Sequence, residues 1–357
     1  MNICYQPHEH INKYTMVSQI VYCMKMVRAS MGTLGVLGLE LVQMDTPPTT
    51  AYLQIYTEKR CMANCQFCAQ ASGSSADMTH IARGMYMPFD LEAVVGRLKI
   101  AYERGYLARA CIQTALYDTW WEDTVCLIKK IREESRIPIS LSVFPLSKIR
   151  YEELKKLGVN ELVIPLDACT PGLFDKIKGK TTGGPYSWEK HIKGIKTASL
   201  VFEKVGTHLI IGFGESDEDA IKVISDLWNN NVNTALFSYT YIPGTQSKAS
   251  DKAESETVKH YRTVQLARHL IMEKLAFYSD MRFKDGTLID YGVQEEVLLN
   301  IIEDGSAFQT SGCPGCNRPM ANETFSKIFN FPKKPDEVEK DIIKNDLGLQ
   351  SKHIAKT

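Results

Sequence analysis

Two patterns of apolar and polar positions alternate along most of this chain. Eight short apolar runs, rich in residues that favour strands, predict β-strands; they are residues 49–56, 107–116, 137–144, 161–167, 205–214, 233–242, 276–283 and 305–312. Between them, apolar residues recur at helical spacing, as in residues 91–105, 151–158, 217–231, 257–275 and 293–305. Strands that alternate with helices form parallel βα units, and eight such units predict a closed (βα)8 barrel of the TIM type.

The alternating region also sets the predicted domain organisation. The barrel is expected over residues 49–330, after an N-terminal extension over residues 1–48. Residues 331–357 are charged and predict a C-terminal tail with a solvated helix. One barrel of this size is ordinary for a chain of 357 residues.

Composition and charge limit the binding partners and the cellular compartment expected for this barrel. Lys plus Arg and Asp plus Glu balance at 42 each, so no net field recruits nucleic acid or an anionic membrane. The longest apolar stretch, residues 31–44, contains Glu40 and is too short to span a bilayer. Ten cysteines without a recognisable export signal favour a reducing compartment and metal or redox chemistry over disulfides. We therefore expect a cytoplasmic protein with no nucleic-acid or membrane partner.

Three cysteines are crowded into the segment CMANCQFC. Cys61, Cys65 and Cys68 follow the first predicted strand, at the end where barrels of this kind build their active sites. A zinc site would need a fourth ligand close by, and the next cysteine is Cys111. Three thiolates on a 4Fe–4S cluster leave one iron open to a small-molecule chelator. The spacing therefore favours an iron–sulfur site over zinc or buried thiols.

The CxxxCxxC spacing after the first strand resembles the motif of the radical S-adenosylmethionine (SAM) superfamily. The resemblance implies that the cluster binds SAM and generates a 5′-deoxyadenosyl radical, which abstracts hydrogen from an unactivated carbon. It also implies that Phe67, Asp167 and Ile210 bind the cofactor, with Asp167 on the ribose and Ile210 on the adenine. Asp167 equally fits a buried helix cap, and Ile210 equally fits a strand that leads to a helix N-cap at Ser216.

Within this superfamily the chain is similar to biotin synthase over most of residues 50–320. Cys111 matches the cysteine that binds an auxiliary cluster at the end of the second strand of that enzyme. The other two strand cysteines of biotin synthase fall near Ser140 and Gly206 here. Its 2Fe–2S cluster therefore lacks ligands in this chain, which argues against a biotin synthase.

A second cysteine pair lies where the eighth predicted strand ends, in SGCPGCNRPMANE. Cys313 and Cys316 form a CxxC turn that presents two thiolates to one metal, with a zinc half-site or a redox dithiol as alternatives. In a closed barrel this turn meets Cys111 at the mouth. We therefore predict that Cys111, Cys313 and Cys316 hold a second 4Fe–4S cluster that faces the first.

Two clusters at one barrel mouth suggest sulfur insertion, with the auxiliary cluster as the sulfur source. A CxxC on a biotin-synthase-like chain resembles the subunits of the two-component lipoyl synthase of archaea and some bacteria. The resemblance implies an octanoylated lipoyl carrier protein as substrate, a second, related radical SAM subunit and a low-potential electron donor. It makes Ser311 the candidate fourth ligand of the auxiliary cluster, since ordinary lipoyl synthase uses a serine oxygen; Cys23 and Cys4 are the other candidates.

Two other classes of function stay open. Another biotin-synthase-like radical SAM enzyme, such as biotin synthase or a maturase or mutase of hydrogenase or pyrrolysine assembly, would share most of these motifs without an evident need for the CxxC. An iron–sulfur scaffold or electron carrier would have no use for the cofactor positions. Binding of SAM by the reduced protein would separate an enzyme from a carrier.

Overall fold

A computed structural model of the protein describes residues 24–248, 254–319 and 328–349. Its centre is a nine-stranded sheet with the order β3-β4-β1-β2-β5-β6-β7-β8-β9. Six neighbouring strands are parallel: β2 (Thr50–Ile55), β5 (Arg109–Gln113), β6 (Ile139–Ser142), β7 (Glu161–Val163), β8 (Val205–Ile211) and β9 (Val232–Ser238). They confirm the first six predicted strands.

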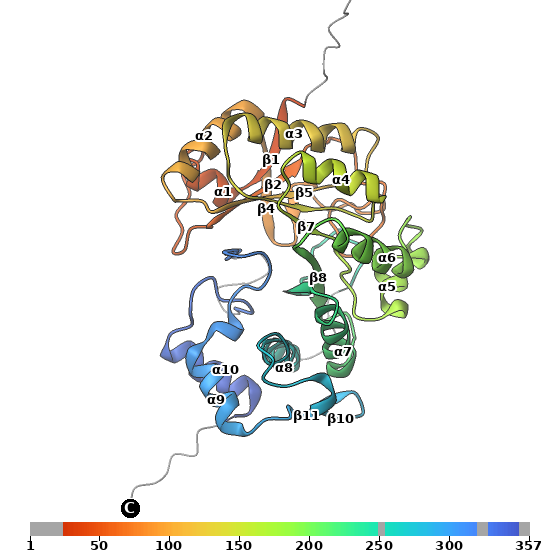
Figure 1. Ribbon diagram of the computed structural model, residues 1–357, viewed down its shortest axis with the longest axis vertical. Coiled ribbons are helices and arrows are strands. Elements are labelled where there is room, and N and C mark those ends of the chain that lie inside the picture. The colour runs from red at the N-terminus through yellow and green to blue at the C-terminus, as the bar shows by residue number, and fades with distance from the viewer. Residues whose placement is uncertain (1–23, 249–253, 320–327, 350–357) are drawn as a thin grey trace, which may run out of the picture.

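Helices connect the parallel strands, as βα units require. They are α2 (Leu91–Glu103), α3 (Trp120–Glu134), α4 (Lys148–Lys156), α5 (Pro171–Ile177), α6 (Trp188–Ser199), α7 (Asp217–Trp228) and α8 (Glu254–Met272). Figure 1 shows α2, α3, α4, α6 and α7 on the outer side of a curled sheet. The curled sheet and its outer helices confirm the predicted class, an α/β fold of the TIM-barrel type.

Helix α7 illustrates how local sequence builds these units. Ser216 Oγ accepts from the Asp219 N–H, and the Asp219 carboxylate accepts from the Ser216 N–H, which completes a capping box. Ile221 and Ile224 are buried one turn apart and turn the apolar stripe of the helix towards the sheet. The predicted N-cap at Ser216 is confirmed.

The last two predicted strands, residues 276–283 and 305–312, do not join the sheet. Residues 282–284 form β10 (Arg282–Lys284), which pairs with β11 (Thr287–Asp290) in a separate hairpin. The later segment contains a 3-10 turn, Ser306–Phe308, where a strand was expected. Strand β9 is therefore an edge within the described residues, and the sheet is a partial barrel with six parallel strands, not the closed barrel of eight.

Side chains satisfy the free edge of β9 in place of a seventh strand. The Leu236 N–H donates to Ser311 Oγ at 2.8 Å, and the Leu236 carbonyl accepts from the Arg318 guanidinium at 3.2 Å. The Asn233 amide donates to the Gly312 carbonyl at 2.7 Å. The two bonds to Leu236 occupy backbone groups that another strand would need. The segment that precedes the CxxC therefore follows β9 without pairing with it.

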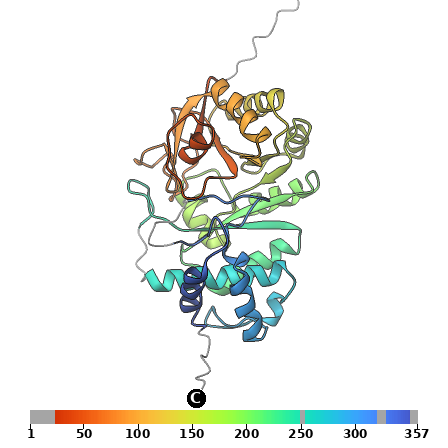
Figure 2. The ribbon, with the colours of Figure 1, turned by 90° about the vertical axis from the view of Figure 1, so that its left-hand side faces the viewer.

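The N-terminal region adds antiparallel strands to the other edge of the sheet. β1 (Met26–Ser30), within the predicted extension, pairs with β2 on one side and with β4 (Gly84–Asp90) on the other. α1 (Met31–Val36) follows β1, and β3 (His80–Ile81) pairs with β4. The N-terminal strands and the C-terminal helices lie towards opposite ends of the long axis of the molecule (Figure 2).

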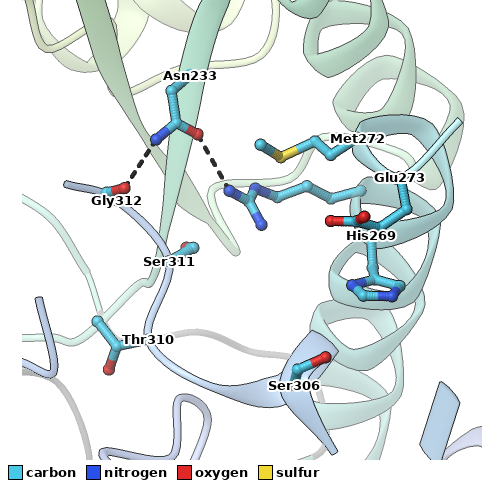
Figure 3. Close-up of a pocket in the computed structure, with 9 residues that line it drawn as sticks. Asn233, His269, Met272, Glu273, Ser306, Thr310, Ser311 and Gly312 are labelled. Carbon is cyan, nitrogen blue, oxygen red and sulfur yellow. Dashed lines mark hydrogen bonds between the residues drawn. The ribbon is translucent and has the colours of Figure 1, made fainter. Parts of the chain in front are cut away.

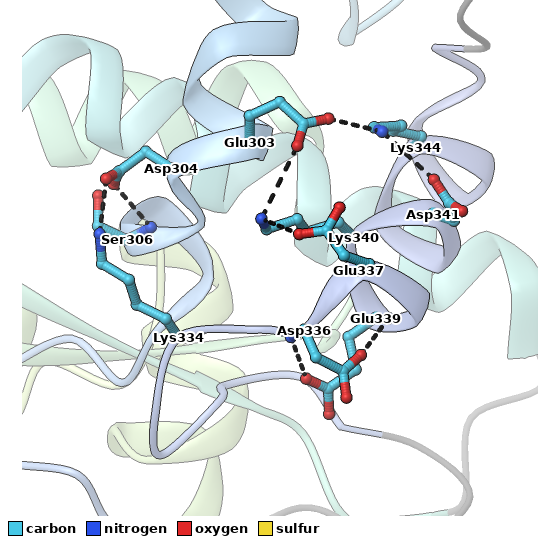
Figure 4. A network of polar contacts seen from close by, with 10 residues as sticks. All are labelled: Glu303, Asp304, Ser306, Lys334, Asp336, Glu337, Glu339, Lys340, Asp341 and Lys344. Atoms are coloured by element: carbon cyan, nitrogen blue, oxygen red, sulfur yellow. Dashed lines mark hydrogen bonds and ion pairs between the residues drawn. The ribbon is translucent and has the colours of Figure 1, made fainter.

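Helix α10 (Glu337–Leu347) packs against α8 and against α9 (Glu295–Asp304) at the C-terminal end. An ion-pair network joins α9 to α10 (Figure 4): Glu303 lies 2.7 Å from Lys344 and 3.8 Å from Lys340. Ile343 of α10 is fully buried. The predicted tail helix is thus packed against the body of the protein. None of the described helices has the length and apolar character to cross a membrane.

Candidate active site

The CMANCQFC segment forms a loop directly after β2. Its backbone is held internally: the Cys61 N–H donates to the Gln70 carbonyl at 2.8 Å, and the Cys68 N–H donates to the Cys65 carbonyl at 3.1 Å. The Arg60 guanidinium donates to two further carbonyls of this region, at 2.7 and 2.8 Å. The loop therefore presents its three thiols from an ordered backbone at the C-terminal end of the parallel strands.

The donor set of this loop suits a cluster. The three cysteines are partly buried, and burial of the thiols raises the pKa of Cys68 to about 11 and also raises the pKa of Cys61 and Cys65. Thiolates in such surroundings need a cation to neutralise them, which bound iron would supply. Within the described residues, no group of three or more His, Cys, Asp or Glu side chains is arranged around one metal ion. A 4Fe–4S cluster binds each thiolate through a different iron, and the three thiols of this loop supply three such ligands.

A cavity of about 160 Å³ lies beside this loop. Phe67, Cys68, Asp167 and Ile210 all line it, so the structure brings together the residues predicted to bind the cofactor. They come from the C-terminal ends of β2, β7 and β8, and most of the remaining wall is apolar. A largely apolar cavity with a few fixed polar groups is typical of a cofactor site.

Asp167 is held by a lysine that the sequence analysis missed. Its backbone has a φ of 65°, and its carboxylate accepts from Lys178 Nζ at 2.6 Å. Both side chains are buried, and Lys178 also donates to the Pro165 carbonyl at 2.5 Å. Thr170, not Asp167, caps the following helix, so the helix-cap interpretation of Asp167 is wrong. Lysine at the end of an amphipathic helix ordinarily points to solvent, so no sequence signal indicated this buried pair.

The turn after Ile210 is fixed by a histidine that the sequence analysis also missed. Glu215 accepts from two backbone N–H groups of this turn, at 2.5 and 3.0 Å, and Phe213 packs against Phe67 with ring centroids 5.4 Å apart. His260 on α8 binds Glu215 at 3.1 Å and Asp217 at 2.5 Å. Burial disfavours its cation, but the two carboxylates raise the pKa of His260 to about 9. Helix α8 is therefore tied to the turn that lines the cavity.

A second set of thiols meets inside the sheet. Tyr52, Cys111, Ser140 and Glu161 are consecutive register partners on β2, β5, β6 and β7. Cys316 Sγ lies 3.3 Å from Tyr52 Oη. Burial raises the pKa of Cys111, and the thiols of the CxxC add to this rise because they lie close by. The structure thus brings Cys111 together with the CxxC, while the role of these thiols as ligands stays a prediction.

The CxxC turn does not lie at the mouth predicted for it. The Thr49 hydroxyl donates to the Gly315 carbonyl at 2.6 Å, and the Thr49 N–H donates to the Asn317 side chain at 3.0 Å. Thr49 precedes β2, whereas the CMANCQFC loop follows it. The two cysteine sets therefore lie towards opposite ends of the same strands, because the segment before the CxxC runs along β9 without forming an eighth strand. Tyr52, which contacts Cys316, lies three residues before Ile55, the last residue of β2. Three residues of an extended strand span about 10 Å.

Ser311, the candidate fourth ligand, borders another cavity. Its Oγ accepts the hydrogen bond from the Leu236 N–H on β9. The adjoining cavity has a volume of about 280 Å³. At its wall the Asn233 amide donates to the Gly312 carbonyl (Figure 3), and Asn233 Oδ1 accepts from the Arg268 guanidinium at 3.2 Å. The ligand role of Ser311 stays a prediction. The other two candidates, Cys23 and Cys4, lie outside the described residues.

Comparison with known proteins identifies the class that this fold and site define: an enzyme that uses SAM and an iron–sulfur cluster. The family model for the radical SAM superfamily matches residues 55–227, a range that contains the cysteine loop, Asp167 and Ile210. Residues 55–227 therefore form a domain of the radical SAM superfamily. That membership implies one 4Fe–4S cluster and SAM, and the CMANCQFC loop with its adjoining cavity fits both.

Individual relatives share no more than 25% sequence identity with this chain in the comparisons described below. Methylornithine synthase (PylB) has a solved structure that matches with a TM-score of 0.50 at 16% sequence identity, over 63% of each chain, which shows a shared fold. An uncharacterized protein of Methanocaldococcus jannaschii is 25% identical over 167 residues, 46% of this chain and 41% of the relative. A lipoyl synthase of Buchnera aphidicola is 25% identical over 178 residues, 48% of this chain and 51% of the relative. The chain spans about half the length of these curated relatives.

Proposed function

We propose that this radical SAM enzyme inserts sulfur into an octanoyl chain carried on a lipoyl carrier protein, as one of two cooperating lipoyl synthase subunits. The observation that carries the proposal is the second set of thiols, Cys111, Cys313 and Cys316, gathered from distant parts of the sequence onto the interior of the sheet. The similarity to a lipoyl synthase supports it over part of the chain.

The arrangement of the two thiol sets suits sulfur insertion. A cluster and SAM bound at the C-terminal strand ends would supply the radical chemistry of the superfamily. The second set lies further along the same strands, so a flexible alkyl chain that enters the barrel can meet both. Anchoring that chain through a lysine amide would fix one end and place a chosen methylene at the reacting position.

The direct test is an anaerobic assay of the reconstituted protein. It is given SAM, a reductant, an octanoyl-lysyl peptide and, in parallel, a related radical SAM subunit, and the products are read by mass. We expect a thiolated peptide, no product from free octanoate or dethiobiotin, and the full dithiolane only with the second subunit. Efficient conversion of dethiobiotin to biotin by this chain alone would return it to the biotin synthases.

A variant pair separates the two thiol sets. Cys313→Ala should leave cleavage of SAM measurable and remove sulfur from the product, because the first cysteine loop is untouched. Cys169→Ala is the matched control, since Cys169 is a free thiol buried in the core and takes part in neither set. If the Cys313 variant thiolates the peptide at the rate of the unmodified protein, the CxxC is structural.

A further inference from the structure

Glu161 has an unusual environment for a carboxylate. It is the first residue of β7 and only 3% exposed, and glutamate is almost never this buried without a close partner. Its register partner is Ser140, whose own partner across the sheet is Cys111. The carboxylate therefore lies on the same rung of side chains as Cys111, one of the second set of thiols.

Arg109 forms an ion pair with this carboxylate but gives it no short hydrogen bond. Arg109 Nη1 lies 3.4 Å from Glu161 Oε2, but it makes its short hydrogen bond, 2.7 Å, to the Ser140 hydroxyl. Within the described part of the chain, Glu161 Oε2 is buried and has no hydrogen-bond partner. A buried carboxylate oxygen without a hydrogen bond is costly. This oxygen is therefore suited to bind a further cationic group.

The thiols are what this carboxylate faces. Burial raises the pKa of the Cys111 and Cys313 thiols, and Glu161 lies close enough to both thiols to raise their pKa further. The other oxygen donors nearby are engaged. Tyr52 Oη accepts from the Arg318 N–H at 2.8 Å, and the Ser140 hydroxyl accepts from Arg109.

We propose that Glu161 is the fourth protein ligand of the auxiliary cluster, through a carboxylate oxygen. The inference rests on the auxiliary cluster of the proposed function, though not on the identity of the substrate. Ser311 is the weaker candidate, because its Oγ is committed to the edge of β9. Oxygen is a harder donor than thiolate and binds iron–sulfur iron less tightly. One iron of the cluster is then held more weakly than the other three.

The test isolates the auxiliary cluster by working in a chain with Cys61, Cys65 and Cys68 replaced by Ala. This background should bind about four irons per chain after anaerobic reconstitution. Adding Glu161→Gln should lower the content to about three irons and give the spectrum of a three-iron cluster on mild oxidation, read by electron paramagnetic resonance and Mössbauer spectroscopy. Glu161→Cys should keep about four irons, and Ser311→Ala, the matched control, should change neither reading.

The outcomes are distinguishable. If Glu161→Gln keeps four irons and an unchanged spectrum of the reduced cluster, Glu161 is not a ligand and the inference is overturned. If the background binds no iron even with Glu161 present, the auxiliary cluster and the proposed function both fail. Folding is checked in the chain with its first loop intact, where Glu161→Gln should still bind the first cluster and cleave SAM. Loss of that activity together with all the iron would mean a structural role and would also overturn the inference.

Discussion

His260 should stabilise the protein in a strongly pH-dependent way. Burial of the ring opposes its protonation, but the hydrogen bonds to Asp217 and Glu215 prevail and raise its pKa from 6.5 to about 9. A difference of about 2.5 pKa units corresponds to about 3 kcal/mol of stabilisation of the folded state. Because the folded pKa is the higher one, this stabilisation is complete below about pH 6.5 and is lost as the pH rises through about 9.

The perturbation is His260→Gln, which keeps a hydrogen-bonding side chain and removes the titrating cation. We expect a loss of about 4 kcal/mol in the free energy of unfolding at pH 6, about 3 kcal/mol from the charge and about 1 kcal/mol from the hydrogen bonds themselves. The loss should shrink to about 1 kcal/mol at pH 9.5, where only neutral hydrogen bonds differ. Urea denaturation under anaerobic, reducing conditions measures both values. The pKa itself is read from the His260 ring signal by nuclear magnetic resonance.

Lys222→Gln serves as the control on the same side of the molecule. Lys222 lies 2.7 Å from Asp226, but both side chains are more than half exposed, so its loss should cost less than about 1 kcal/mol at either pH. An equal loss of stability at pH 6 and pH 9.5 for His260→Gln would refute the reasoning. In that case His260 acts by packing, and its charge does not hold α8 to the turn that contains Glu215.

Three further outcomes are expected. Asp167→Asn leaves Lys178 buried without its counter-ion and should cost roughly 3–5 kcal/mol of stability, measured by urea denaturation. Adding Lys178→Met should recover this stability without restoring SAM binding, measured by equilibrium dialysis. Ile210→Ala should weaken SAM binding about tenfold through lost apolar contact and leave the iron content unchanged; an unaltered dissociation constant would remove Ile210 from the site. Lys344→Met should change the free energy of unfolding by no more than about 1 kcal/mol, because Glu303 is half exposed; a larger loss would mean that the network shown in Figure 4 holds α10 in place.

Features encoded by neighbouring residues were predictable. The first six parallel strands follow from short runs of strand-forming residues, and α7 follows from its capping box and apolar stripe. The CMANCQFC loop was also predictable, since its three thiols lie within eight residues and directly follow a strand. Phe67, Asp167 and Ile210 line one cavity because the C-terminal ends of parallel strands meet at one edge, while their role in cofactor binding stays a prediction.

Long-range contacts decided the rest. The segment before the CxxC has the composition of a strand, yet Ser311 and Arg318 bind the edge of β9 through side chains, and the turn therefore reaches the start of β2. The buried charges Lys178, His260 and Glu161 leave no periodic signal, because each depends on partners brought in from other elements. Local sequence sets where strands, caps and thiol loops form. Which buried charge meets which partner depends on how the sheet curls and on which segment covers its open edge.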